Sequence, residues 1–240
     1  FNTLGMRRAL RSGEPVRISR ARSVEAAFLA SVGRSQRRRV AAALTEAQAL
    51  AARSGDRHAQ ALAVGVEGQA ALFFGEFARA QVLCQEAEGL MREHCVGAAR
   101  EVATMRVWAA RAMQYMGKVH ELAAWLPEAM QECRDRGDLY TETTLRAGVV
   151  PFARLCAGDP AGARRECVAA RAAWTTAGFH VQHYFAAMSE IATAIYAGDG
   201  AAAVELARAI WPVLERSLLL RVQLVRVAAY ETVARALIAA

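Results

Sequence analysis

The sequence has few of the residues that enzyme active sites need. Its only lysine is Lys118 and its only asparagine is Asn2, whereas a protein kinase needs a lysine for the phosphates and a catalytic-loop asparagine for metal. A P-loop is excluded, because Gly117-Lys118 is followed by Val119 and Ala112 replaces the leading glycine. The G-x-S-x-G, H-E-x-x-H and C-x-x-C patterns are also absent. We therefore expect no catalytic residues and no cofactor in this segment.

Metal-ligand spacing is equally scarce. The five cysteines are odd in number, and no two are separated by the two to four residues of a zinc pair. His180 and His183 can share one helix face, but no acidic or cysteine ligand stands beside them. Packing at a helix start, or a polar contact with Tyr184, is therefore favoured over a metal site. Free thiols are typical of a reducing compartment, so we expect a cytoplasmic protein.

Long apolar runs and strand patterns are missing too. A membrane-spanning helix would need a run of about 18 apolar residues, and no such run occurs. Valine and isoleucine rarely show the period-two alternation of a half-buried strand, while alanine-rich runs have high helix propensity. The sequence thus predicts an all-α fold. Because it begins with Phe1 and ends abruptly in Ala239 and Ala240, we expect a segment of a longer protein.

The positive charge is confined to one end. Residues 1–40 hold ten arginines and two glutamates, a net charge of +8, so the remainder of the +7 chain sums to −1. Such an end can meet an acidic partner domain, a nucleic acid or an anionic membrane surface. A solvated arginine face at a domain junction is the favoured interpretation, and nucleic-acid binding is not expected. The centre of this basic end is Arg34, Arg37, Arg38 and Arg39.

Glycine is the residue that sets the architecture. Two interleaved series recur every 40 to 42 residues. The first series is Gly33, Gly75, Gly117, Gly158 and Gly198, and the second is Gly13, Gly55, Gly97, Gly137 and Gly178. One series closes each helical hairpin and the other joins it to the next, so the pattern predicts a solenoid of stacked helix pairs with a period of about 41 residues.

The glycine series predicts the helices directly. We expect a single domain over residues 1–240, with a half repeat at 1–13, five hairpins at 14–218 and a final helix at 219–240. The first helices are expected at about 16–32, 57–74, 99–116, 139–157 and 180–197. The second helices are expected at about 34–54, 76–96, 118–136, 159–177 and 199–217. This gives about twelve helices. Pro127, Pro151 and Pro212 fall inside them and should kink or end the helix.

The order Gly68, Gly75, Phe77, Ala80, Ala87 resembles the tetratricopeptide repeat, with a small residue in the first helix, a turn glycine, an aromatic residue and paired alanines. The turn and alanine spacing recurs at Gly158, Ala163 and Ala170, and partly at Gly198 and Ala203. The resemblance covers nearly all the chain. The repeat period of this sequence, about 41 residues, exceeds the 34 residues of the family, and the tryptophan-leucine start of the family repeat is lacking. It implies a right-handed superhelical α-solenoid.

Four segments are similar to bacterial serine/threonine kinases that carry an NTPase and a helical-repeat tail. The segments are Arg11-Ser-Gly-Glu-Pro15, Gly137-Asp-Leu-Tyr140, Gly178-Phe-His-Val-Gln-His-Tyr184 and Ser217-Leu-Leu-Leu-Arg-Val-Gln-Leu-Val-Arg226. The resemblance implies that this chain is the non-catalytic tail, a scaffold for a protein or peptide or for the kinase and NTPase domains of the same protein. The alternative is the small-molecule or peptide sensor of a solenoid-bearing NTPase transcription activator.

Two kinds of surface are expected, a groove from the resemblance and apolar end helices from the repeat pattern. In tetratricopeptide-like superhelices the first helices line the concave face, which predicts a peptide groove. Its residues are Gln69, Phe73, Arg111, Gln114, Tyr115, Phe152, Met188 and Tyr196. For Phe73, Phe152 and Met188, simple packing between long helices is an equal alternative. We also expect apolar residues of the two end helices to be exposed or covered by another copy, among them Leu4, Leu10, Leu224, Val227 and Leu237.

Overall fold

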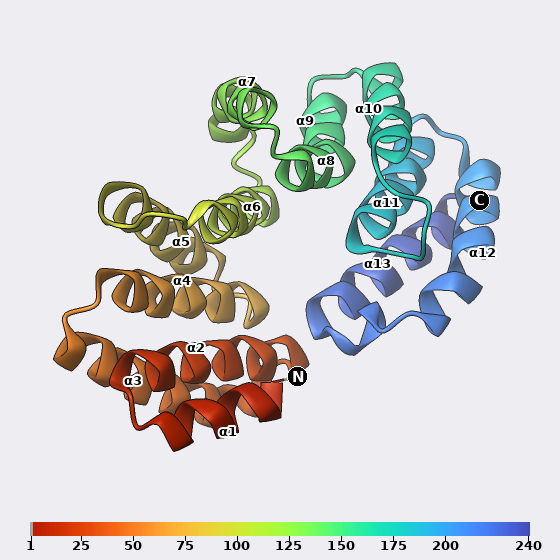
Figure 1. The fold of residues 1–240 in the computed structure, drawn as a ribbon. Coiled ribbons are helices and arrows are strands. Elements are labelled where there is room, and N and C mark those ends of the chain that lie inside the picture. Colours follow the sequence, from red (N-terminus) through yellow and green to blue (C-terminus); the bar gives the residue numbers. More distant parts are fainter. Residues whose placement is uncertain (1) are drawn as a thin grey trace. The chain divides into compact units, whose positions relative to one another are not determined.

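The computed structural model describes residues 2–240, and this part of the chain contains helices and no strand. It forms two compact units that meet in sequence at Met116 and Gly117. The first unit contains α1 (Asn2–Ser12), α2 (Pro15–Val32), η1 (Arg34–Gln36), α3 (Arg37–Ser54), α4 (Arg57–Phe73), α5 (Phe77–His94) and α6 (Ala99–Tyr115) (Figure 1). The all-α expectation is confirmed.

The second unit contains the remaining helices. They are α7 (Val119–Arg136), α8 (Leu139–Gly148), α9 (Val150–Cys156), α10 (Pro160–Ala173), α11 (Val181–Tyr196), α12 (Gly200–Arg216), η2 (Leu219–Arg221) and α13 (Gln223–Ala239). Most helix boundaries lie within three residues of those expected from the glycine series. Two differ more, because α10 ends at Ala173 and α13 begins at Gln223 after the short η2.

All ten glycines of the two series have a positive φ, between 65° and 109°, and no other described residue does. A positive φ is unfavourable for any residue with a Cβ atom, so glycine is the residue that can turn the chain sharply where each helix ends. Gly55 and Gly137 show this in the left-handed α conformation, each donating its backbone N–H to a carbonyl of the helix it ends. The turns predicted from spacing alone are confirmed.

An aspartate directly after the turn glycine begins the next helix at four joints. The carboxylates of Asp56, Asp138, Asp159 and Asp199 each accept the backbone N–H of the residue three positions later, at 2.6 to 3.0 Å. Such N-caps satisfy one of the otherwise unpaired N–H groups of the first turn, each worth about 1 kcal/mol. The Gly-Asp pair therefore ends one helix and starts another.

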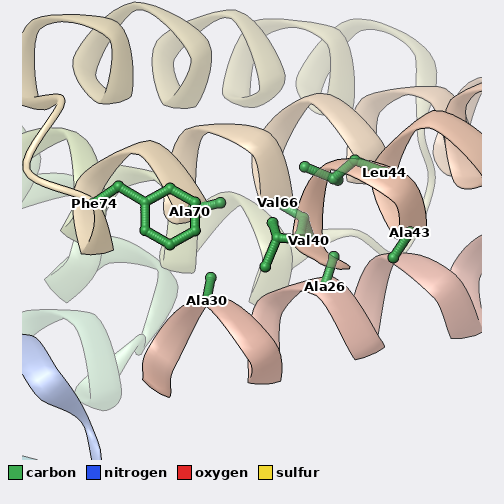
Figure 2. Close-up of a cluster of buried hydrophobic side chains, with 8 residues drawn as sticks. All are labelled: Ala26, Ala30, Val40, Ala43, Leu44, Val66, Ala70 and Phe74. Carbon is green, nitrogen blue, oxygen red and sulfur yellow. The ribbon is translucent and has the colours of Figure 1, made fainter. Parts of the chain in front are cut away.

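Within each unit, helices pack on their neighbours in sequence, and the first helix of a hairpin also packs on the first helix of the next. In the first unit α2 contacts α3 and α4, and α4 contacts α5 and α6. In the second unit α11 contacts α10, α12 and α13 in the same way. The core is divided accordingly into small clusters between adjacent hairpins, such as Ala26, Ala30, Val66 and Phe74 between α2, α3 and α4 (Figure 2). This is the neighbour-to-neighbour packing of a helical repeat.

Proline breaks only one of the three helices in which it falls. The helix expected at 139–157 is divided into α8 and α9 just before Pro151, so the described chain has thirteen α-helices where about twelve were expected. Proline cannot donate to the carbonyl four residues earlier, which is that of Ala147. Ser189 of α11 donates its hydroxyl to this carbonyl at 2.7 Å. At Pro127 and Pro212 the helix does not end, because α7 and α12 continue through them.

Candidate functional site

A chain of stacked side chains lies on the first unit where α4 turns into α5 beside the end of α6. The ring of Tyr115 stacks on Phe77, with centroids 4.7 Å apart and an interplanar angle of 18°. The guanidinium carbon of Arg111 lies 5.6 Å from the centroid of Tyr115, and Arg111 also donates to Gln114 at 2.8 Å. All four residues are half-buried. Aromatic and guanidinium surface is thus held in place while part of it stays accessible.

Two further residues of the predicted groove lie on α4, which packs against α6. Phe73 contacts Trp108 edge to face, with ring centroids 5.6 Å apart. Phe73 also packs against the cluster between α2, α3 and α4, so it contributes to the core as the alternative interpretation held. Gln69 is half-buried one turn earlier on the same helix. Five of the eight predicted groove residues therefore belong to two adjacent helices of one unit.

The other three predicted groove residues belong to the second unit. Met188 is half-buried and packs against both hydrophobic clusters of α11, which favours the packing interpretation for this residue. Phe152 is half-buried on α9, and Tyr196 is exposed at the end of α11. Each unit is a separate body, so a groove that runs from the first unit to these residues stays a prediction.

The basic end is only partly neutralised. Arg37 forms an ion pair with Glu76 of the next hairpin, and its guanidinium carbon lies 5.2 Å from the centroid of Phe74. Arg39 donates to the neutral Gln36 at 3.2 Å. Arg34, Arg38 and Arg39 are exposed and have no carboxylate partner among the described residues. One arginine of the four is thus part of the joint between hairpins, and three face solvent.

A polar cluster that the sequence did not reveal crosses three first helices of the first unit. Arg20 of α2 lies 2.9 Å from Nδ1 of His58 at the start of α4, and 3.7 Å from the Asp56 carboxylate. Nε2 of His58 lies 3.7 Å from Glu101 at the start of α6. These residues join consecutive hairpins at one end of their first helices. Their sequence signal is only their nearness to the turn glycines.

His180 and His183 act in packing at the start of α11. The backbone N–H of His180 donates to Nδ1 of His183 at 3.0 Å, and the indole N–H of Trp174 donates to Nδ1 of His180 at 3.0 Å. The two imidazole rings stack with centroids 5.6 Å apart. Burial, followed by the nearby His180, lowers the pKa of His183. Within residues 2–240, no group of three or more histidine, cysteine, aspartate or glutamate side chains is placed to hold a metal.

Two cavities lie between consecutive second helices, with a first helix as their floor. One, of about 290 Å³, is lined by residues of α3, α4 and α5 and includes Glu67 and Arg79. The other, of about 560 Å³, is lined by residues of α10, α11 and α12 and includes Glu190 and Arg164. Both floors carry a glutamate eight residues before a turn glycine, and this shared spacing is the sequence signal by which the two cavities could be found.

The two floor glutamates are held by the helix before them. Gln48 of α3 donates to Glu67 at 2.7 Å, and Arg171 of α10 donates to Glu190 at 2.5 Å. Burial raises the pKa of Glu190, and Arg171 opposes the increase. The cavities therefore have charged groups that are already engaged within the protein, set on an apolar surface.

Comparison with known proteins gives no further assignment. No protein-family model matches the chain, and no curated protein matches it significantly. No helix within residues 2–240 has both the length and the apolar character needed to cross a membrane. Function is therefore inferred from the residues and their geometry.

Proposed function

We propose that this chain is a non-catalytic protein-interaction module that binds an extended peptide segment of a partner. Its helix pairs would stack as a tetratricopeptide-like α-solenoid, a right-handed superhelix with a period of about 41 residues. The ten positive-φ glycines support this repeat, because they form two series and recur every 40 to 42 residues within each series. The four segments similar to bacterial kinases suggest that the module is the C-terminal repeat region of a cytoplasmic bacterial serine/threonine kinase.

The observation that carries the proposal is the stack of Arg111, Tyr115 and Phe77 on the first unit. Aromatic and arginine side chains dominate the energetics of protein interfaces, because they bury large surfaces and also form hydrogen bonds. Here intramolecular stacking holds them in place before a partner arrives, which reduces the entropy lost on binding. A single guanidinium with amides and aromatic rings suits a peptide better than a polyanion.

Peptide selection tests the proposal although the natural partner is unidentified. Random peptides displayed on phage are selected on the intact chain, and one enriched peptide is synthesised with a fluorescent label. We expect its Kd, measured by fluorescence anisotropy, to rise at least about tenfold in Arg111→Gln and in Tyr115→Leu, since each removes one central interface contact. Leucine retains apolar contact with Phe77, so the loss of binding reports on the ring and hydroxyl.

Tyr230→Ala is the matched control, because Tyr230 is an exposed tyrosine on α13 of the second unit. This variant should bind the peptide as the natural chain does. The proposal is wrong if selected peptides bind Arg111→Gln and Tyr115→Leu with unchanged Kd. A loss of affinity in Tyr196→Ala would place the predicted groove on both units.

A small-molecule sensor is the second candidate, and the cavity on α11 favours it. Its volume of about 560 Å³ falls within the range of ligand sites, and Arg164, Glu190 and Glu205 converge on it. Filling the cavity by Leu206→Trp should abolish any ligand-induced rise in Tm and leave peptide binding at Arg111 unchanged. A ligand whose stabilising effect survives Leu206→Trp would exclude this cavity as its site.

A further inference from the structure

The joint between α10 and α11 is the longest connection between two helices in the described chain. Seven residues, 174–180, separate Ala173 from Val181, whereas Gly55 and Asp56 alone join α3 to α4. Within the described chain, none of residues 175–180 donates its backbone N–H to a backbone carbonyl. Side chains therefore hold this segment in place.

Two imidazoles at the start of α11 provide these contacts. His180 directly precedes α11, and His183 is the third residue of the helix. Nδ1 of His180 accepts the indole N–H of Trp174, and Nδ1 of His183 accepts the backbone N–H of His180, both at 3.0 Å. The ring of His183 also stacks on Phe179, with centroids 5.7 Å apart. Both ends of the segment are thereby tied to the first turn of α11.

Both hydrogen bonds require a neutral imidazole. An indole N–H and a backbone N–H can only donate, so each Nδ1 must carry a free electron pair. A protonated imidazole has an N–H at both ring nitrogens and can accept neither bond. The centroids of the two rings are 5.6 Å apart, so two positive charges there would also repel each other. Protonation of either ring therefore removes one of the contacts that hold the segment.

The place of these rings at a helix N-terminus adds to the sensitivity. The first turn of a helix has unpaired N–H groups and a positive dipole, which favour acceptors and disfavour cations. At four other joints the acceptor is an aspartate carboxylate, as at Asp56 of α4 and Asp199 of α12. A carboxylate keeps its charge down to about pH 4, whereas an imidazole usually gains a proton below about pH 6.5. Mild acid should therefore affect the α11 joint and spare the other four.

The groups around the pair leave a positive charge uncompensated. Within residues 2–240, neither ring has a carboxylate partner. Arg171 of α10 is a nearby cation, and it forms an ion pair with Glu190 of α11 at 2.5 Å. From α8, the ring of Tyr140 contacts Trp174 edge to face, with centroids 6.2 Å apart. Helices η2 and α13 contribute apolar side chains to the cluster that includes Phe179, namely Leu219, Leu220 and Val225.

The titration of His183 gives the direction of the pH effect. Burial lowers its pKa below the usual 6.5, as do the nearby His180 and Arg171, and a backbone hydrogen bond with Thr175 opposes the decrease. Between the lowered pKa and the usual one, the unfolded chain binds more protons than the folded chain. The free energy of unfolding should therefore fall as pH decreases through this interval.

We propose that His180 and His183 form an acid-sensitive latch. While both rings are neutral, they hold residues 174–180 against the first turn of α11, and proton uptake by either ring releases the segment. Release exposes the rings of Trp174 and Phe179, which contact the pair while it is neutral. The latch lies within the second unit and is separate from the Arg111 and Tyr115 stack of the first unit.

Hydrogen exchange of the intact chain, followed by nitrogen-15 NMR, tests the latch. The two N–H groups to follow are the His180 amide and the Trp174 indole, the latter assigned with Trp174→Phe. Their protection, relative to intrinsic exchange at the same pH, should fall about tenfold between about pH 7.5 and about pH 5, because each proton taken up can weaken the closed state up to tenfold per pH unit. The midpoint should coincide with the titration of the histidine ring protons. Amides of α4 should keep their protection.

Substitutions separate titration from shape. In the double variant His180→Asn, His183→Gln, amide oxygens replace the two Nδ1 acceptors and do not titrate. Glutamine is also a usual partner of the backbone N–H that precedes a helix, at the position that His183 occupies. Protection in this variant should be the same at both pH values. His120→Gln is the matched control, because His120 is an exposed histidine on α7 of the same unit, and it should behave as the natural chain does.

The latch is wrong if the natural chain keeps full protection in acid, or if the ring protons and the indole N–H change at different pH values. An equal acid-induced loss in the double variant would assign the response to other groups. Loss of protection in α4 at the same pH would indicate global acid unfolding instead of local release. If the double variant is unprotected at both pH values, the agreement of midpoints in the natural chain decides. Peptide binding at Arg111 should be unchanged in the double variant, so this inference and the proposed function fail independently.

Discussion

Replacing Gly68 by alanine should destabilise the first unit, whereas the same replacement at Gly89 should stabilise it. Both glycines lie inside helices, α4 and α5, and both have ordinary helical φ values. Their surroundings differ. A Cβ atom at Gly68 would lie 2.8 Å from Sγ of Cys84 and 3.0 Å from the Cys84 backbone nitrogen. A Cβ atom at Gly89 would meet nothing within 4 Å.

The magnitudes follow from two opposing effects. Alanine in place of glycine inside a helix stabilises by roughly 0.5–1 kcal/mol. Overpacking of a close-packed core typically costs about 1–3 kcal/mol, and the backbone of Cys84 cannot move aside as a flexible side chain would. Gly89→Ala should therefore raise the free energy of unfolding by about 0.5–1 kcal/mol. Gly68→Ala should change the free energy of unfolding by about 0 to −2.5 kcal/mol, because overpacking places the two variants about 1–3 kcal/mol apart.

Urea unfolding followed by circular dichroism measures this difference. Both residues belong to the first unit, so the two variants test the packing of the same compact unit. The m value should be unchanged, because neither substitution alters the surface exposed on unfolding. If Gly68→Ala stabilises the protein as much as Gly89→Ala does, the close approach of α4 and α5 is wrong.

Three other measurements test the packing and titration of the folded chain. Ser189→Ala should lower the free energy of unfolding by about 1–3 kcal/mol, since it leaves the Ala147 carbonyl freed by proline without a donor; no loss in urea unfolding would contradict this contact. A thiol reagent should modify the exposed Cys156 in the native protein but not Cys84, because Cys84 is buried and burial raises its pKa to about 12. Rapid modification of both cysteines would contradict the burial of Cys84. Burial raises the pKa of Glu190 in the folded state, so between the usual glutamate pKa and this raised pKa the folded protein binds more protons than the unfolded one. The free energy of unfolding should therefore fall as pH rises through this interval. Glu190→Gln should remove this part of the pH dependence, and an unchanged pH profile of Tm in that variant would refute the reasoning.

The sequence by itself determined the helices and their joints. A positive φ, an aspartate N-cap and a proline act within a few residues, so Gly55, Asp56 and their counterparts could be interpreted from local chemistry. The regular interval between turn glycines then predicted where each helix lies. Local chemistry did not decide between a kinked and an ended helix at the prolines: α7 and α12 continue through Pro127 and Pro212. At Pro151 the helix is interrupted, and a hydroxyl from α11 satisfies the freed carbonyl.

The tertiary structure alone decided which side chains meet. Arg111 and Tyr115 were expected on one surface from the resemblance to tetratricopeptide-like superhelices, but their stacking with Phe77 depends on how α4, α5 and α6 pack. The same packing buries Val66 and Phe74 yet leaves Phe28 exposed, although all three share the repeat's pattern. Burial depends on whether a neighbouring helix is present, and a single hairpin's sequence contains no information on that. The sequence therefore predicts the repeat unit, and the three-dimensional packing decides which of its side chains are buried.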